Sequence, residues 1–68
     1  MNKLKQIRFF KDVTQPLLAL KTGIHQSRIS LIENGLVTPR DEEKKKIAKS
    51  LQCTVEEVFP SRSSVNGI

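Results

Sequence analysis

The chain has 68 residues, 37% of them hydrophobic, and a formal net charge of +5. This length supports one small domain, and the hydrophobic content is enough for one compact core and too high for a disordered chain. The longest apolar run, 17–20, is too short to cross a membrane, and the basic balance favours either a polyanionic partner such as nucleic acid or a solvated lysine-rich surface.

Helical signals recur from the amino terminus, and no segment alternates as a strand would. The first helix is expected after Asn2, a residue type that often caps helices, and it should end at a break over 12–13. Thr14 is the cap of a second helix predicted at 15–21, with Pro16 in its first turn, where a missing N–H costs little. The sequence therefore predicts two short helices before the first glycine.

Glycine, threonine and proline mark the boundaries of the next two helices. Gly23 can take the positive φ of a tight turn, so the third helix is predicted at 26–34, with Gly35 ending it. Thr38 is expected to cap a fourth helix, with proline at its first position, that runs to about Leu51.

The last predicted helix is a single turn. Thr54 has capping-box spacing and opens a turn that continues through Phe59, which Pro60 stops. Residues 61–68 are expected to form a flexible polar tail. The prediction is thus an all-α domain of five short helices over residues 1–60, followed by that tail.

The helices predicted at 15–21 and 26–34 are the most informative unit. Ala19 is small and is expected where the two helices cross, and Gly23 lies in the turn between them. This spacing is typical of a helix-turn-helix, whose second helix enters the major groove of DNA. The apolar residues expected to cover the core are Leu18, Ile24, Ile29 and Ile32.

The second helix of this pair has one polar face. Gln26 lies in its first turn, where a recognition helix reaches base edges, and a glutamine can bond N6 and N7 of adenine together. Leu31 offers an apolar contact for a thymine methyl, and Arg28 suits a phosphate or a guanine. The same face also fits an ordinary solvated surface, and the pattern alone leaves both interpretations open. The base-reading candidates are Gln26, Ser27, Arg28, Ser30 and Leu31.

A family resemblance favours the DNA-reading interpretation. Residues 1–59 resemble the Cro/cI-type helix-turn-helix family, also called the XRE family. The matching residues are Thr14-Gln15, Leu18-Ala19, Gly23-Ile24, Ile29, Ile32-Glu33-Asn34-Gly35, Pro39, Ile47-Ala48, Leu51 and Val58-Phe59. The resemblance implies a lambda-repressor-like fold and a transcriptional regulator, a repressor in the main hypothesis. It also implies a homodimer that binds a palindromic operator in double-stranded DNA.

The resemblance also assigns roles to single residues. It implies that Gln15 contacts a phosphate and braces Gln26. Glu33 matches the family's buried acid, which pairs with an arginine of the first helix, here Arg8; an unpaired surface arginine is the alternative. Together with Ala19 and Gly23, these two residues are the structural candidates. The other implied phosphate contacts come from the end of the recognition helix and the following loop: Asn34, Thr38 and Arg40.

The sequence departs from the family pattern at four positions. Pro16 replaces the usual acid, and His25 stands where a Ser or Thr cap is common, so the recognition helix should start less firmly. Leu36 stands where Lys or Arg often follows the Asn-Gly pair, which removes a phosphate contact. Gln52 replaces the usual glycine after the fourth helix, so that turn is expected to carry strain or a different cap.

Catalysis, metal binding and a cofactor are not expected. The one histidine, His25, has no serine and acid arranged as a triad, and no glycine-rich phosphate loop is present. Cys53 is expected to be a buried hydrophobe in the reducing cytoplasm. The run 41–46 is interpreted as a solvated helix face with i, i+4 ion pairs, and not as a DNA contact.

Other functions remain open at this point. The chain also fits a protein-interaction module, such as an antitoxin or an adaptor, in which Leu31, Leu36 and Val37 form the contact patch; alternatively Leu36 and Val37 pack against the fourth helix. A small controller protein of a restriction–modification system is a third option. If the protein dimerises, the region of Val58, Phe59 and the tail is the expected interface.

Overall fold

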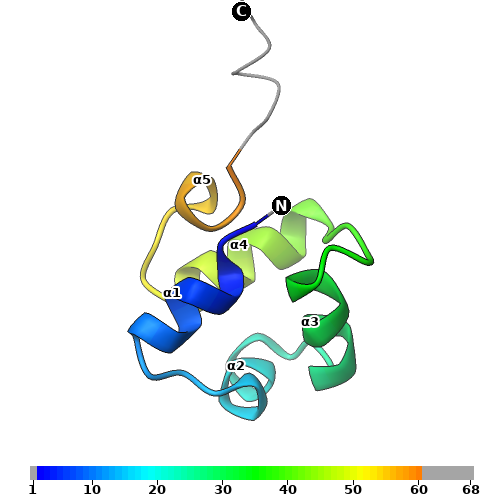
Figure 1. Ribbon diagram of the computed structural model, residues 1–68, viewed down its shortest axis with the longest axis horizontal. Helices are drawn as coiled ribbons and strands as arrows, with labels where there is room; N and C mark the ends of the chain where they lie inside the picture. The colour runs from blue at the N-terminus through cyan, green and yellow to red at the C-terminus, as the bar shows by residue number, and fades with distance from the viewer. Residues whose placement is uncertain (1, 61–68) are drawn as a thin grey trace, which may run out of the picture.

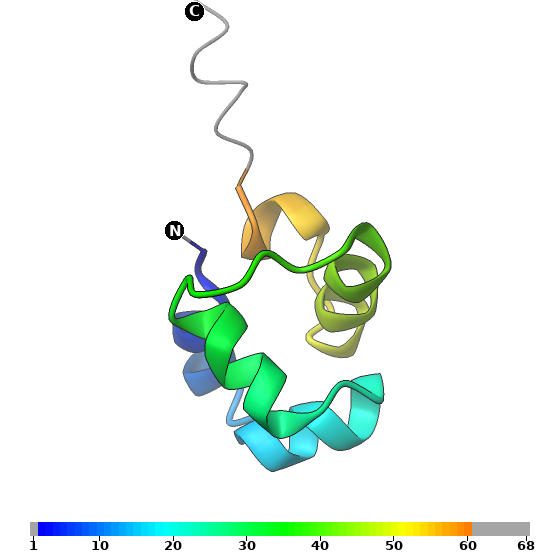
Figure 2. The same cartoon turned by 90° about the vertical axis from the view of Figure 1, so that its right-hand side faces the viewer.

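The computed structural model describes residues 2–60, which form five α-helices and contain no strand. In Figures 1 and 2, α2 and α5 lie at opposite ends of the molecule, and the loop after α3 leads into α4. The all-α prediction with five short helices is confirmed, and the predicted tail at 61–68 lies outside the described residues. The helices are α1 (Leu4–Phe10), α2 (Gln15–Thr22), α3 (Gln26–Glu33), α4 (Asp41–Ser50) and α5 (Val55–Val58).

A single hydrophobic core receives side chains from every one of these helices. Each helix has ten residues or fewer, so none would be stable alone, and tertiary packing holds them in place. All four apolar residues predicted for the helix pair belong to this core. The largest fully buried side chains are Leu4, Leu18, Ile29, Ile32, Ile47, Leu51 and Val58.

The boundaries of α2 follow from local chemistry. Thr14 Oγ1 accepts a hydrogen bond from the Leu17 N–H at 3.2 Å, as a cap residue should. Gly23 has a φ of +76° and its N–H donates to Ala19 O at 2.8 Å, which ends the helix. A Cβ at Gly23 would meet no atom within 4 Å, so this position requires glycine for its backbone conformation and not for space. The predicted cap and turn are both confirmed.

The fourth helix begins later than predicted. It starts only at Asp41, so Arg40 and not Thr38 is the residue at its cap position. Pro39 is buried in the preceding loop and is not the first residue of the helix. The three acids of its first turn suit the positive end of a helix dipole. Glu43 Oε1 also accepts the Arg40 N–H at 2.8 Å, so the helix is capped from within its own first turn.

The region after α4 contains one confirmed prediction, at Gln52. Gln52 has a φ of +57°, a left-handed conformation that is costly for a residue with a side chain, as expected where glycine is missing. Val58 and Phe59, by contrast, are 0% and 8% exposed and belong to the core of a single chain. The dimer interface expected around these two residues and the tail stays a prediction, because the tail lies outside the described residues.

Candidate nucleic-acid interface

The two faces of α3 differ as the sequence predicts. Ile29 and Ile32 are fully buried, whereas Gln26, Ser27 and Leu31 are exposed. Figure 2 shows α3 on the outside of the molecule, close to α2. The remaining two base-reading candidates, Arg28 and Ser30, are half-buried at the edges of the outward face.

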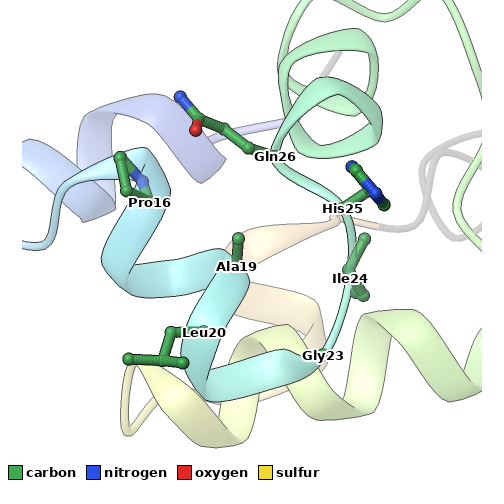
Figure 3. Close-up of a pocket in the computed structure, with 7 residues that line it drawn as sticks. All are labelled: Pro16, Ala19, Leu20, Gly23, Ile24, His25 and Gln26. Carbon is green, nitrogen blue, oxygen red and sulfur yellow. The ribbon is translucent and has the colours of Figure 1, made fainter.

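The α2–α3 turn holds the start of α3 in place. Buried Thr22, which the sequence reasoning did not single out, donates from Oγ1 to Leu18 O at 2.8 Å and accepts from the Ile24 N–H at 3.2 Å. One hydroxyl therefore ties the last turn of α2 to the chain leading into α3. Figure 3 shows the shallow pocket at this junction, lined by Pro16, Ala19, Leu20, Gly23, Ile24, His25 and Gln26.

A buried ion pair lies behind α3. Arg8 Nε is 2.6 Å from Glu33 Oε2, Arg8 Nη2 is 3.3 Å from Oε1, and Arg8 Nη1 donates to Val13 O at 3.0 Å. Only 6% and 3% of the two side chains is exposed. The implied pairing of Arg8 with Glu33 is confirmed, and the alternative of a surface arginine is excluded.

Hydrogen bonds connect this ion pair to the outward face of α3. Gln15 Nε2 donates to Glu33 Oε1 at 3.0 Å, and Gln26 Nε2 donates to Gln15 Oε1 at 3.4 Å. The implied bracing of Gln26 by Gln15 is therefore present, although Pro16 is the next residue of α2. We call the chain of contacts from Arg8 through Glu33 and Gln15 to Gln26 the amide relay.

The amide relay has a single direction. A carboxylate only accepts hydrogen bonds, so Gln15 must turn its NH₂ group to Glu33 and its oxygen to Gln26. Gln26 must then offer an N–H to Gln15, which leaves its Oε1 and its second N–H for another partner. Adenine presents a donor at N6 and an acceptor at N7 in the major groove, which is the complementary pair.

Arg28 has a partner that the sequence reasoning missed. Its Nε and Nη2 donate to the two carboxylate oxygens of Glu43 at 2.6 and 2.9 Å. The Arg28 hydrogen bond, followed by the Arg40 N–H, lowers the pKa of Glu43 to about 2. Glu43 also stands three residues after Arg40, the spacing at which an acid accepts the backbone N–H of a helix cap, but this spacing gives no sign of its contact with Arg28.

The predicted phosphate-contact residues lie at both ends of α3. Gln15 is half-buried beside its start, whereas Asn34, Thr38 and Arg40 are exposed after its end. Asn34 uses one N–H of its amide to reach Ser30 O at 2.9 Å, so one N–H is left for another acceptor.

The departures at His25 and Leu36 also have structural counterparts. The His25 side chain makes no cap hydrogen bond, so α3 starts without a side-chain cap, as expected. Leu36 is 70% exposed, whereas Val37 packs against the core. Of this apolar pair, Leu36 is therefore the exposed residue.

Comparison with known proteins identifies the family. No curated protein matches the chain. Among the described residues, no helix has the length and apolar character needed to cross a membrane. A helix-turn-helix family model matches residues 4–58, from the first residue of α1 to the last residue of α5. The protein therefore belongs to the Cro/cI-type (XRE) helix-turn-helix family of DNA-binding regulators.

Proposed function

We propose that this protein is a sequence-specific transcriptional repressor that reads the major groove with α3. The amide relay is the observation that carries this proposal, because it orients a solvent-exposed glutamine from a buried ion pair. A surface that only faces solvent gains nothing from a glutamine held in one orientation, whereas a bidentate contact with adenine requires that orientation.

The base contacts follow from the exposed face of α3. Gln26 would read adenine, and Ser27 and Ser30 would bond to base edges beside it. Leu31 is 40% exposed and would contact a thymine methyl. Gln15, Asn34, Thr38 and Arg40 would contact phosphates on either side and so fix the register of α3 in the groove.

The regulator would act as a symmetric homodimer. Two copies of α3 would then enter successive major grooves about 34–36 Å apart, on a palindromic operator. Because Val58 and Phe59 are buried, the dimer contact would have to use other residues.

Selection from random double-stranded DNA by the full-length protein tests this function. We expect a palindromic motif, with an adenine in each half-site and flanking positions that carry little information. Recovery of DNA without any shared motif would contradict the proposal. The salt concentration must be fixed, because phosphate contacts alone produce strong and unspecific binding at low salt.

A protein-interaction module, such as an antitoxin, is the second candidate. The exposure of Leu36 at 70%, next to Leu31 at 40%, favours it. The two functions differ in what Leu31→Ala and Leu36→Ala should do. In a DNA reader, Leu31→Ala weakens the preference for one thymine and Leu36→Ala changes nothing. In an interaction module, DNA is bound without sequence preference, and both variants lose the protein partner.

A further inference from the structure

One carboxylate joins α3 to the start of α4. Both oxygens of Glu43 accept from Arg28, and Oε1 accepts in addition from the Arg40 backbone N–H. Arg28 lies in the first half of α3, and Arg40 is the residue immediately before α4. Glu43 therefore links the recognition helix with the end of the connection that follows it, a connection visible in Figure 1.

This connection, residues 34–40, is fastened at both ends. At its start, the Gly35 N–H donates to Ile32 O at 3.1 Å and the Leu36 N–H donates to Leu31 O at 2.9 Å. At its end, Glu43 accepts from Arg40. Three of the four proposed phosphate-contact residues lie on this segment, so its position relative to α3 determines where the DNA backbone is contacted.

The geometry of Arg28 argues against a direct role in base reading. Nε and Nη2 form the fork of the guanidinium group, and Glu43 occupies this fork. The Glu43 side chain is only 17% exposed. If Arg28 turned to DNA, it would leave a largely covered carboxylate without its cation, which is unfavourable.

We propose that Arg28 and Glu43 are positioning residues whose ion pair holds residues 34–40 in place relative to Gln26. The pair then sets the overall affinity for DNA and leaves the choice of bases to the other side chains of α3. This inference deepens the proposed function and rests on it.

Two variants separate the ion pair from the helix cap. Glu43→Gln removes the charge but keeps an oxygen that can accept from the Arg40 N–H. Arg28→Met removes the guanidinium group and keeps an unbranched side chain. Glu42→Gln is the matched control, because it removes a neighbouring, exposed acid of the same helix turn.

Hydrogen exchange of the free, full-length protein tests whether the pair holds the segment. We expect the amides of residues 34–38 and 40 to exchange about two- to fivefold faster in Arg28→Met and Glu43→Gln, while those of α2 are unchanged. Glu42→Gln should match the wild type. Unchanged exchange of the segment in the two variants would overturn the proposal.

Binding to the selected operator and its single-base variants tests the effect on DNA. Relative to Glu42→Gln, Glu43→Gln should weaken all operators by one common factor. Arg28→Met should also do so relative to the wild type, and the double variant should bind no more weakly than the weaker single variant. An altered base ranking in Arg28→Met would mean that Arg28 reads a base, and tighter binding by Glu43→Gln would mean that Glu43 withholds Arg28 from DNA. Either result overturns the inference.

The two proposals fail in different ways. If selection recovers no motif, the proposed function fails, and hydrogen exchange still decides whether the pair holds the segment. If a motif is found but exchange is unchanged, only the positioning role fails.

Discussion

The orientation of one amide group follows from the chemistry of a buried acid. Glu33 can only accept, so the two glutamines of the amide relay donate in sequence toward it. What Gln26 offers to DNA is thus decided by a residue that is almost completely buried. If Gln26 reads a base pair as proposed, residues without any contact to that base pair affect how it is read.

Gln15→Ala and Gln26→Ala should therefore affect the same base pair. Gln26→Ala should cost about 1–3 kcal/mol of discrimination at one position of the operator. Gln15→Ala should weaken discrimination at that position, because Gln26 then lacks its acceptor, and it should also weaken binding to all sequences. Competition binding with single-base operator variants measures both effects. If the effects of the two substitutions on discrimination were fully additive, the relay would have no role in reading.

A strained residue after α4 provides a test that is independent of DNA. Gln52 has a φ of +57°, which costs a residue with a side chain about 1–2 kcal/mol, whereas glycine is not penalised there. After the larger entropy loss of glycine, Gln52→Gly should still stabilise the domain by about 0.5–1 kcal/mol. Urea unfolding measures the change. The control Lys49→Gly, within α4, should destabilise by about 1 kcal/mol. A Gln52→Gly variant less stable than the wild type would show that its side chain contributes more than its backbone costs.

At the scale of elements, ion pairs fix α3 on two sides. The Arg8–Glu33 pair joins α3 to α1, and the Arg28–Glu43 pair joins it to α4. The two pairs differ in burial, since Arg8 is 6% exposed and Arg28 is 36% exposed. Their loss should therefore have different consequences for stability.

Arg8→Met should destabilise the domain strongly. It leaves the buried carboxylate of Glu33 without its cation, which typically costs about 3–5 kcal/mol, a large share of the stability of so small a domain. Circular dichroism during thermal unfolding measures the loss, with Lys5→Met on the exposed side of α1 as the control. A change below about 1 kcal/mol would mean that Gln15 and water satisfy Glu33 without Arg8.

The Arg28–Glu43 pair should make stability depend on pH in acid solution. The pKa of Glu43 lies at about 2 in the folded chain and at an ordinary value of 4.5 without these contacts. The stabilising contribution is therefore complete above pH 4.5 and is lost as the pH falls toward 2. The difference in unfolding free energy between the wild type and Glu43→Gln should shrink over this range. A constant difference would contradict the pairing.

At the scale of the whole molecule, the predictable features were those set by nearby residues. The cap at Thr14, the turn at Gly23 and the buried Ile29 and Ile32 depend on local chemistry and helical spacing, and all were predicted. The Arg28–Glu43 pair was missed because its partners are 15 residues apart, while the run around Glu43 favours i, i+4 pairs instead.

Long-range contacts were accessible only through resemblance or not at all. The family pattern supplied the pairing of Arg8 with Glu33, and no spacing rule would have found it. Val58 and Phe59 are covered within the chain, and the sequence does not tell which neighbour covers an apolar residue. The sequence also gives no sign of the contact that Asn2 makes, because its amide donates to Ile32 O at 2.8 Å, 30 residues away.

Random-DNA selection with the wild type and Gln26→Ala in parallel tests the central claim most directly. If α3 reads DNA through the orientation of Gln26, the wild type enriches a palindrome with an adenine in each half-site. The variant then enriches the same palindrome with that position degenerate. No enriched motif for the wild type, or an identical motif for both proteins, would contradict the claim.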